Sequence, residues 1–266
     1  HNHGYTDENG RRQQTWPLRE HRRWLERIYI YLHEHADNAP LVTHLSGATS
    51  RVAGFSWADY FLDGELWQQK LVQDRAYKAM SLDMMRAEVS PRIYGPGLIW
   101  LSQLYRIRPF VPASQRAKWS VEPYAERHLA GMLLLHDVIP DRTSQNDAAL
   151  QVWNVLDRFD LDDSDTMCYY YEHDNPWRDN ADKTSTAVGA FIKKDASKML
   201  LELFNNRDEA FTFRITLDSA KAFGKNCEYL VINAESGQKI YQGNGEFTAT
   251  LPMRDYCLLE IQPIQK

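Results

Sequence analysis

Two short apolar stretches of this sequence, near residues 41 and 57, each end in polar residues that could do chemistry. His44 follows the first stretch, and Asp59, Asp63 and Glu65 follow the second. In parallel α/β barrels, the residues that act on a substrate lie at the carboxyl ends of the strands. We therefore expect His44, Asp59 and Glu65 to leave neighbouring strands on one shared rim.

Carboxylates at a strand end suit the cleavage of a glycosidic bond. That reaction uses an acid to protonate the leaving oxygen, and a second group that acts at the anomeric carbon. Asp59 and Glu65 are the catalytic candidates, and Asp63 is a candidate for substrate binding. The alternative is structural, because Asp63, Gly64 and Glu65 also have the pattern of a turn that starts a helix.

Three further side chains could contact a sugar. A neutral imidazole at His44 could bond a sugar hydroxyl or orient a carboxylate, whereas the alternative is a core histidine. The ring of Trp57 could stack on a sugar face, although a place in the core is the competing reading. His3 lies in a polar stretch that could reach the substrate from a loop.

The sequence predicts no cofactor and no metal. It has no phosphate-binding glycine loop, no zinc spacing and no nucleophile elbow. The acidic run from Asp160 to Asp165 could hold calcium, but it lacks the glycine and terminal glutamate of an EF-hand, so a solvated turn is predicted. The three cysteines are expected to be small buried residues, with a Cys227–Cys257 disulfide as the alternative.

Helical spacing of apolar residues defines the elements that carry these groups in the first two thirds of the chain. A polar loop over residues 1–15 precedes a helix, and that helix leads into a short two-sided apolar strand, which is half of a βαβ unit. The predicted helices cover residues 17–36, 66–80, 82–88, 123–138 and 148–159, and the predicted strands cover 41–45, 56–62 and 98–101.

After about residue 182 the helical spacing gives way to period-two alternation. Short strands separated by turn clusters are typical of an antiparallel β-sandwich. The predicted strands cover residues 187–192, 199–204, 211–217, 227–232, 246–251 and 256–261. We therefore predict an α/β domain over residues 1–180 and a β-sandwich domain over residues 181–266.

Composition excludes several classes of protein. The 266 residues carry a net charge of -5 with both signs interspersed, which argues against a nucleic-acid binder. No apolar run approaches the roughly 20 residues that span a bilayer, so no membrane span is predicted. No signal peptide is visible, and the first residues have the pattern of the middle of a loop, so we expect a longer polypeptide.

With these features in view, the chain resembles the bacterial glycoside hydrolases of family 123 and their uncharacterised relatives. The order and spacing of five stretches carry the resemblance: HNHGYTDENGR (1–11), LREHRRWLERIY (18–29), THLSG (43–47), WADYFLDGE (57–65) and GMLLLHD (131–137). It implies an α/β plus all-β fold, namely the C-terminal half of a (β/α)8 TIM-type barrel followed by an antiparallel β-sandwich. It also implies that the barrel strands here are the last three.

The resemblance further implies an activity. The expected enzyme is a glycosidase that degrades a bacterial, plant or host polysaccharide and is secreted, periplasmic or bound at the cell surface. Family 123 is expected to use an adjacent Asp–Glu pair at an earlier strand end, and that pair would lie upstream of residue 1. The missing half of the barrel would come from the same polypeptide or a companion chain. The alternative function is a non-catalytic carbohydrate-binding protein that uses the same cleft.

Overall fold

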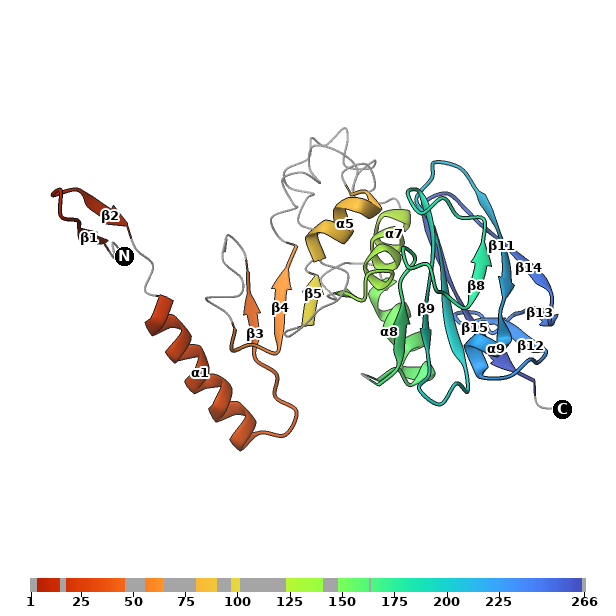
Figure 1. Ribbon diagram of the computed structural model, residues 1–266, viewed down its shortest axis with the longest axis horizontal. Coiled ribbons are helices and arrows are strands. Elements are labelled where there is room, and N and C mark those ends of the chain that lie inside the picture. The colour runs from red at the N-terminus through yellow and green to blue at the C-terminus, as the bar shows by residue number, and fades with distance from the viewer. Residues whose placement is uncertain are drawn as a thin grey trace. The chain divides into compact units, whose positions relative to one another are not determined.

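The computed structural model describes residues 4–14, 18–45, 56–64, 80–89, 97–100, 123–140, 148–162 and 164–264 (Figure 1). These residues fall into two compact units. The first lies within His1–Leu66 and Ile93–Ile99, and the second within Trp67–Arg92 and Trp100–Lys266. Neither unit ends at the expected boundary between residues 180 and 181, so the division into two domains there stays a prediction.

The first unit begins with a hairpin where the sequence predicted a polar loop. Strands β1 (Gly4–Thr6) and β2 (Arg12–Gln14) pair antiparallel. The Asp7 carboxylate closes the turn because it accepts bonds from the Asn9 and Arg11 amides and from the Gln13 side chain. These bonds hold the pKa of Asp7 below its ordinary value. This hairpin is held by polar side chains and shows no alternation of apolar residues, so the hydrophobic pattern of the sequence did not predict its strands.

The helix predicted next is present as α1 (Leu18–His35). It is followed by β3 (Val42–His44) and β4 (Tyr60–Asp63), which run parallel, and β5 (Gly97–Trp100) lies beside β4 in the strand order (Figure 1). The Gly97 amide donates to the Asp59 carbonyl at 2.8 Å. A side chain at position 97 would meet the Tyr60 ring at 2.7 Å, so glycine permits this close approach.

Among the described residues, the second unit includes the helices α5 (Leu82–Val89), α7 (Pro123–Leu134) and α8 (Ala148–Phe159), and the two-residue strand β6 (Ile139–Pro140). The prediction for residues 148–159 is confirmed. The helix predicted to end at 138 stops at Leu134, and Asp137 then adopts a positive φ of 58° that turns the chain. Nearly all of the helix predicted over 66–80 lies outside the described residues.

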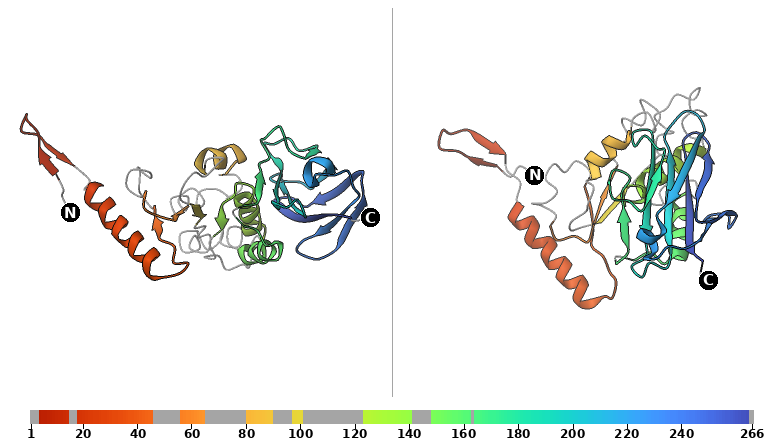
Figure 2. Two further views of the ribbon diagram at one scale, coloured as in Figure 1. Left: turned by 60° about the horizontal axis from the view of Figure 1, so that its bottom comes forward. Right: turned by 45° about the vertical axis from the view of Figure 1, so that its right-hand side comes forward.

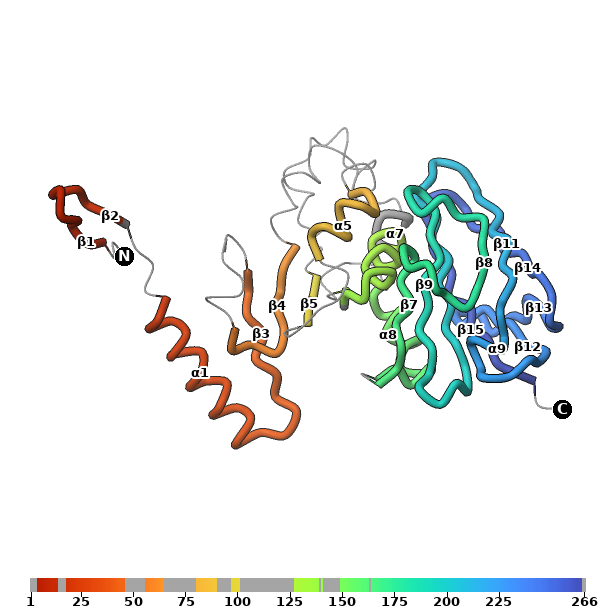
Figure 3. The backbone as a smooth tube through the Cα atoms, in the orientation of Figure 1, coloured from red at the N-terminus to blue at the C-terminus, as the bar shows by residue number. Residues whose placement is uncertain are grey.

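Residues 164–264 form two antiparallel sheets, which we call the two-sheet region (Figures 1 and 3). The larger sheet has the order β13-β12-β15-β10-β9-β7, and the smaller has the order β14-β11-β8. The strands are β7 (Thr166–Cys168), β8 (Trp177–Asp179), β9 (Thr186–Ile192), β10 (Met199–Asn205), β11 (Phe211–Leu217), β12 (Tyr229–Asn233), β13 (Lys239–Gly243), β14 (Glu246–Leu251) and β15 (Asp255–Pro263), and the short helix α9 (Ser219–Phe223) follows β11.

A common apolar core joins the two sheets. Leu201 and Leu203 of the larger sheet and Phe213 and Ile215 of the smaller one are each fully buried within it. Alternate residues of each strand point to opposite faces, so the larger sheet has a second face to cover. Helices α7 and α8 lie along that second face, as the two views in Figure 2 also show.

The contact between α7 and the larger sheet is close. A side chain at Gly131 would meet the Tyr256 side chain at 2.6 Å, so only glycine lets the helix approach β15 this closely. Arg127 adds a polar clamp one turn earlier. Its guanidinium donates to the Glu235 and Asp255 carboxylates and lies 4.5 Å from the centre of the Tyr256 ring. These partners hold the pKa of Arg127 above its ordinary value against the opposing effect of burial.

Glu202 of β10 is an ionisable residue buried in the larger sheet. It is 2% exposed and lies across from Gly189 on one side and Leu258 on the other. Neither of its carboxyl oxygens has a hydrogen-bond partner in the part of the chain that the structure describes. Burial alone raises the pKa of Glu202 well above its ordinary value of 4.5, so this carboxyl is protonated over a wide pH range.

Within the described ranges, none of the helices combines the length and the apolar character that crossing a bilayer requires.

Candidate functional site

The parallel pair β3 and β4 sets the geometry of the candidate site. Its register aligns His44 with Leu62, and the Leu45 amide donates to the Leu62 carbonyl at 2.9 Å. His44 and Asp63 therefore both lie at the carboxyl ends of their strands, as the sequence predicted. Asp63 is one residue past the partner of His44, so their side chains leave opposite faces of the sheet. The burial agrees, because His44 is exposed and Asp63 is only 5% exposed.

Asp63 is a buried carboxyl group at the point where the chain turns off β4. Its Oδ1 accepts a bond from the Gly64 amide at 2.8 Å. Gly64 has a φ of 100°, a conformation that side chains rarely adopt, and it turns the backbone directly after the strand. The turn at Gly64 therefore fixes the position of the Asp63 carboxyl group.

Asp59 does not lie where the sequence placed it. The strand begins at Tyr60 and not at residue 56, so Asp59 precedes β4 and lies at the opposite end of the sheet from His44. Its Oδ2 accepts from the Leu41 amide at 2.7 Å, and its Oδ1 lies 3.3 Å from Nε2 of His33 in α1. The expected rim shared by His44 and Asp59 is therefore wrong. Its catalytic role stays a prediction, which this anchoring position does not favour.

Trp57 lies at the same end as Asp59. It is half-buried, and its ring centre lies 5.7 Å from that of Tyr29 in α1. Tyr29 in turn stacks on His33, with ring centres 4.0 Å apart. Trp57 thus joins a cluster that ties α1 to the start of the strands. The predictions for Glu65 and His3 lie outside the described residues.

A second polar cluster lies in the other unit. His136 is 2% exposed, its Nδ1 is 2.7 Å from the Met132 carbonyl, and its Nε2 is 3.3 Å from the Tyr170 hydroxyl. Burial lowers the pKa of His136 and raises that of Tyr170. Both groups are thus held neutral near pH 7, which suits a structural contact.

The acidic turn that follows α8 holds a lysine. The Lys193 ammonium lies 2.9 Å from the Asp165 carboxylate, and within 4.0 Å of the Asp160 and Asp162 carboxylates. The ammonium group therefore offsets part of the negative charge of this turn. Among the described residues, no group of three or more His, Cys, Asp or Glu side chains is arranged to hold a metal ion.

The cysteines are all free, so the alternative of a Cys227–Cys257 disulfide is wrong. Cys168 is buried, as expected, whereas Cys227 and Cys257 are half-buried. Burial raises the pKa of Cys168 to about 11 and that of Cys257 to about 12, so neither is a ready nucleophile.

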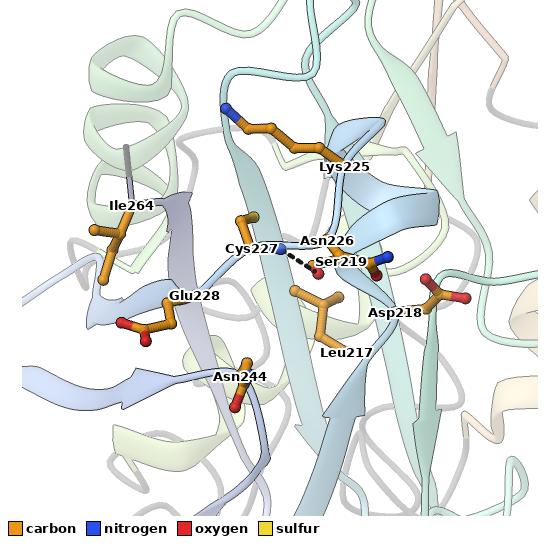
Figure 4. Close-up of a pocket in the computed structure, with 9 residues that line it drawn as sticks. All are labelled: Leu217, Asp218, Ser219, Lys225, Asn226, Cys227, Glu228, Asn244 and Ile264. Atoms are coloured by element: carbon orange, nitrogen blue, oxygen red, sulfur yellow. Dashed lines mark hydrogen bonds between the residues drawn. The ribbon is translucent and has the colours of Figure 1, made fainter. Parts of the chain in front are cut away.

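A hollow that the sequence did not predict lies among the described residues. It is a polar pocket of about 560 Å³ in the two-sheet region, near the two ends of α9 (Figure 4). Its polar residues lie in turns and connections, namely Asp218, Ser219, Lys225, Asn226, Glu228 and Asn244. The sequence signal was weak, because polar residues in turns are expected on any protein surface.

The fold is similar to that of known carbohydrate-active enzymes. An alpha-amylase from Geobacillus thermoleovorans, solved with acarbose, matches with a TM-score of 0.58 and 12% identity, over 91% of this chain and 57% of that chain. An Anoxybacillus alpha-amylase matches with a TM-score of 0.55 and 9% identity, over 94% and 57%. A noncanonic maltogenic alpha-amylase from Thermotoga neapolitana matches with a TM-score of 0.52 and 10% identity, over 98% and 72%.

These likenesses show the fold. This chain spans little more than half the length of two of these enzymes and about three quarters of the third. No family model matches the chain, and no curated protein sequence matches it significantly. The structural neighbours are thus glycoside hydrolases at low sequence identity.

Proposed function

We propose that this chain is part of a glycoside hydrolase that acts on an oligosaccharide or polysaccharide. The observation that carries the proposal is the fold, which matches an alpha-amylase with a TM-score of 0.58 over 91% of the chain. The buried Asp63 at the carboxyl end of the parallel strand β4 supports it, since the substrate sites of such sheets lie at that end.

The groups of this chain would bind and orient the sugar. A carboxylate at Asp63 would accept bonds from sugar hydroxyls, and its position directly before Gly64 fixes its direction. Glu65, two residues further along, remains the catalytic candidate on its place in the sequence alone. Hydrolysis with a second carboxylate would need a partner at about 5–10 Å, which can come from another strand end.

We also propose that further strands complete the sheet. In the described sheet β3 is an edge strand, and its Val42 side chain is 42% exposed. Parallel strands are normally covered on both faces and paired on both edges. If this chain is the C-terminal half of a (β/α)8 barrel followed by a β-sandwich, as the resemblance to family 123 implies, the N-terminal half of the barrel would supply that cover, from the same polypeptide or a companion chain. The two-sheet region would then be the predicted sandwich.

The test is the substitution Asp63→Asn in the full-length protein. We expect kcat/KM for oligosaccharide cleavage to fall about 10- to 100-fold, because a charged hydrogen-bond acceptor of the substrate is lost. Release of reducing ends from maltooligosaccharides, xylooligosaccharides and chitooligosaccharides would be measured. Asp37→Asn, an exposed aspartate of the same unit, is the matched control. Equal activity of the parent and both variants would refute the assignment of Asp63.

A non-catalytic carbohydrate-binding protein is the second candidate. Asp59 holds α1 at the other end of the strands. Among the described residues, Asp63 is then the one carboxylate at the carboxyl ends of β3 and β4, and this favours a binding role. One carboxylate can bind a sugar, whereas hydrolysis commonly uses two. Oligosaccharide binding by the parent without any release of reducing ends would favour this candidate.

A further inference from the structure

We propose that the pocket in the two-sheet region is a second glycan site, which holds one or two sugar units of a neutral oligosaccharide. The pocket lies in the second unit, whereas Asp63 belongs to the first. Its volume of about 560 Å³ falls within the range of about 300–1,000 Å³ that is usual for small-molecule sites. The proposal rests on the proposed function only for the choice of a glycan as the ligand.

The walls of the pocket are fixed by hydrogen bonds that bring four segments together. The Cys227 amide donates to Ser219 Oγ at 3.1 Å, which joins the start of α9 to the chain that leaves it (Figure 4). The Ile264 amide donates to the Glu228 carbonyl at 2.8 Å. A pocket held in this way needs little reordering when a ligand enters.

Asn244 is held in the turn between β13 and β14. The Tyr229 hydroxyl donates to the Gly245 carbonyl at 2.5 Å, and the Gly245 amide donates to the Tyr241 hydroxyl at 2.8 Å. Tyr229 is fully buried, so its ring anchors this turn to the core. The amide of Asn244 is thus presented to the pocket from a fixed backbone.

Four polar side chains of the pocket remain available to a ligand. In the described part of the chain, Lys225, Asn226, Glu228 and Asn244 make no side-chain hydrogen bond or ion pair. Together they offer ammonium and amide donors, and carboxylate and amide acceptors. A sugar hydroxyl both donates and accepts, so this mixture fits a ring that carries several hydroxyls.

The charges and the remaining lining disfavour other ligands. The carboxylates of Asp218 and Glu228 outnumber the single ammonium of Lys225, which works against phosphate or another anion. The apolar lining consists of Leu217, Cys227 and Ile264, which have no aromatic ring, so a flat aromatic ligand would find no stacking partner. These aliphatic groups can contact the C–H face of a sugar instead.

Cys227 supplies a direct probe of occupancy. It lines the pocket and is half-buried, whereas the other two thiols are disfavoured as nucleophiles by their raised pKa values. The rate of its alkylation by iodoacetamide would be followed by peptide mass spectrometry, without sugar and with millimolar maltotriose, xylotriose or chitotriose. We expect at least one trisaccharide to slow the alkylation of Cys227 several-fold, and inorganic phosphate to leave it unchanged.

Two variants test the assignment. Asn226→Ala with Asn244→Ala should abolish the protection, and Glu228→Gln should weaken it. Glu246→Gln is the matched control, since Glu246 is an exposed glutamate of the same region that does not line the pocket. Protection that is absent with all three trisaccharides, that persists in the double variant, or that phosphate alone produces would overturn the proposal. A melting temperature for each variant shows that it is folded, and ligand-observed NMR gives binding independently of Cys227.

The two proposals fail separately. The pocket variants should keep the parent rate on a short chromogenic glycoside, because they leave β3 and β4 intact. Protection of Cys227 should persist in Asp63→Asn, because Asp63 belongs to the other unit. Loss of hydrolysis with intact protection would count against the role of Asp63 alone, and the reverse result would count against the pocket alone.

Discussion

Strands β3 and β10 are covered in different ways. In β3 the middle residue is buried, but the two outer ones are exposed, with Val42 at 42%. In β10 all seven residues are buried, because one face packs into the core of the two-sheet region and the other lies against α7. The larger sheet is therefore covered on both faces within the second unit, whereas Val42 and His44 of β3 stay exposed among the described residues.

The largest expected effect is on stability, and it compares a buried residue of the two-sheet region with an exposed residue of β3. Phe213→Ala should lower the free energy of unfolding by about 3–5 kcal/mol, because a fully buried ring leaves a cavity. Val42→Ala should cost less than about 0.5 kcal/mol, because that side chain is largely exposed. Urea unfolding followed by circular dichroism would measure both. A similar cost at the two positions would mean that the exposed face of β3 is covered, and the contrast would then disappear.

The buried Glu202 should make the stability of the two-sheet region depend on pH. Its folded-state pKa lies above the unfolded value, so the folded state binds more protons than the unfolded state once the pH exceeds about 4.5. Its contribution is complete below that pH and is lost as the pH rises toward the folded-state pKa, by about 1.4 kcal/mol per pH unit. Glu202→Gln should remove this slope and stabilise the protein at pH 8. Unfolding curves at pH 4, 6 and 8 would show it, and an unchanged slope would mean that the carboxyl has a partner.

A smaller effect is expected at the anchor of α1. Asp59→Asn should cost about 1 kcal/mol, because the amide oxygen can still accept from Leu41 while the charge beside the exposed His33 is lost. Its kcat should change less than that of Asp63→Asn. Thermal unfolding and a shared activity assay would measure both variants. The opposite order in kcat would restore Asp59 as the catalytic residue that the sequence suggested.

The smallest effect concerns the thiols. Because Cys168, Cys227 and Cys257 are all free, dithiothreitol should leave the melting temperature unchanged. A fall of several degrees would reveal a cross-link.

Elements with one clear period were predictable from the sequence. The helix Ala148–Phe159 and the strands Phe211–Leu217 and Glu246–Leu251 match the predicted bounds, since each buries one regular face. The three-residue strands β7 and β8 were missed because they are too short to show alternation.

The candidate site was harder to predict than the fold. Asp63 was correctly placed at a strand end, because a glycine follows it and apolar residues precede it. Asp59 was misplaced because the apolar pair at residues 57 and 58 resembles the start of a strand. The hydrogen bonds from the Asp59 and Tyr60 amides to the Leu41 carbonyl set the true start, and pairing between distant segments has no local pattern.

The close contact that Gly131 permits between α7 and Tyr256 determines where the chain could be cut into independently folding fragments. Because α7 rests directly on Tyr256, a fragment that begins at residue 181 would expose the buried Leu200, Phe204 and Tyr256 to water. Such a fragment would aggregate through that bare sheet surface. An autonomous piece would have to start ahead of α7, so the helix pair and the strands behind it would be inherited, exchanged or engineered together.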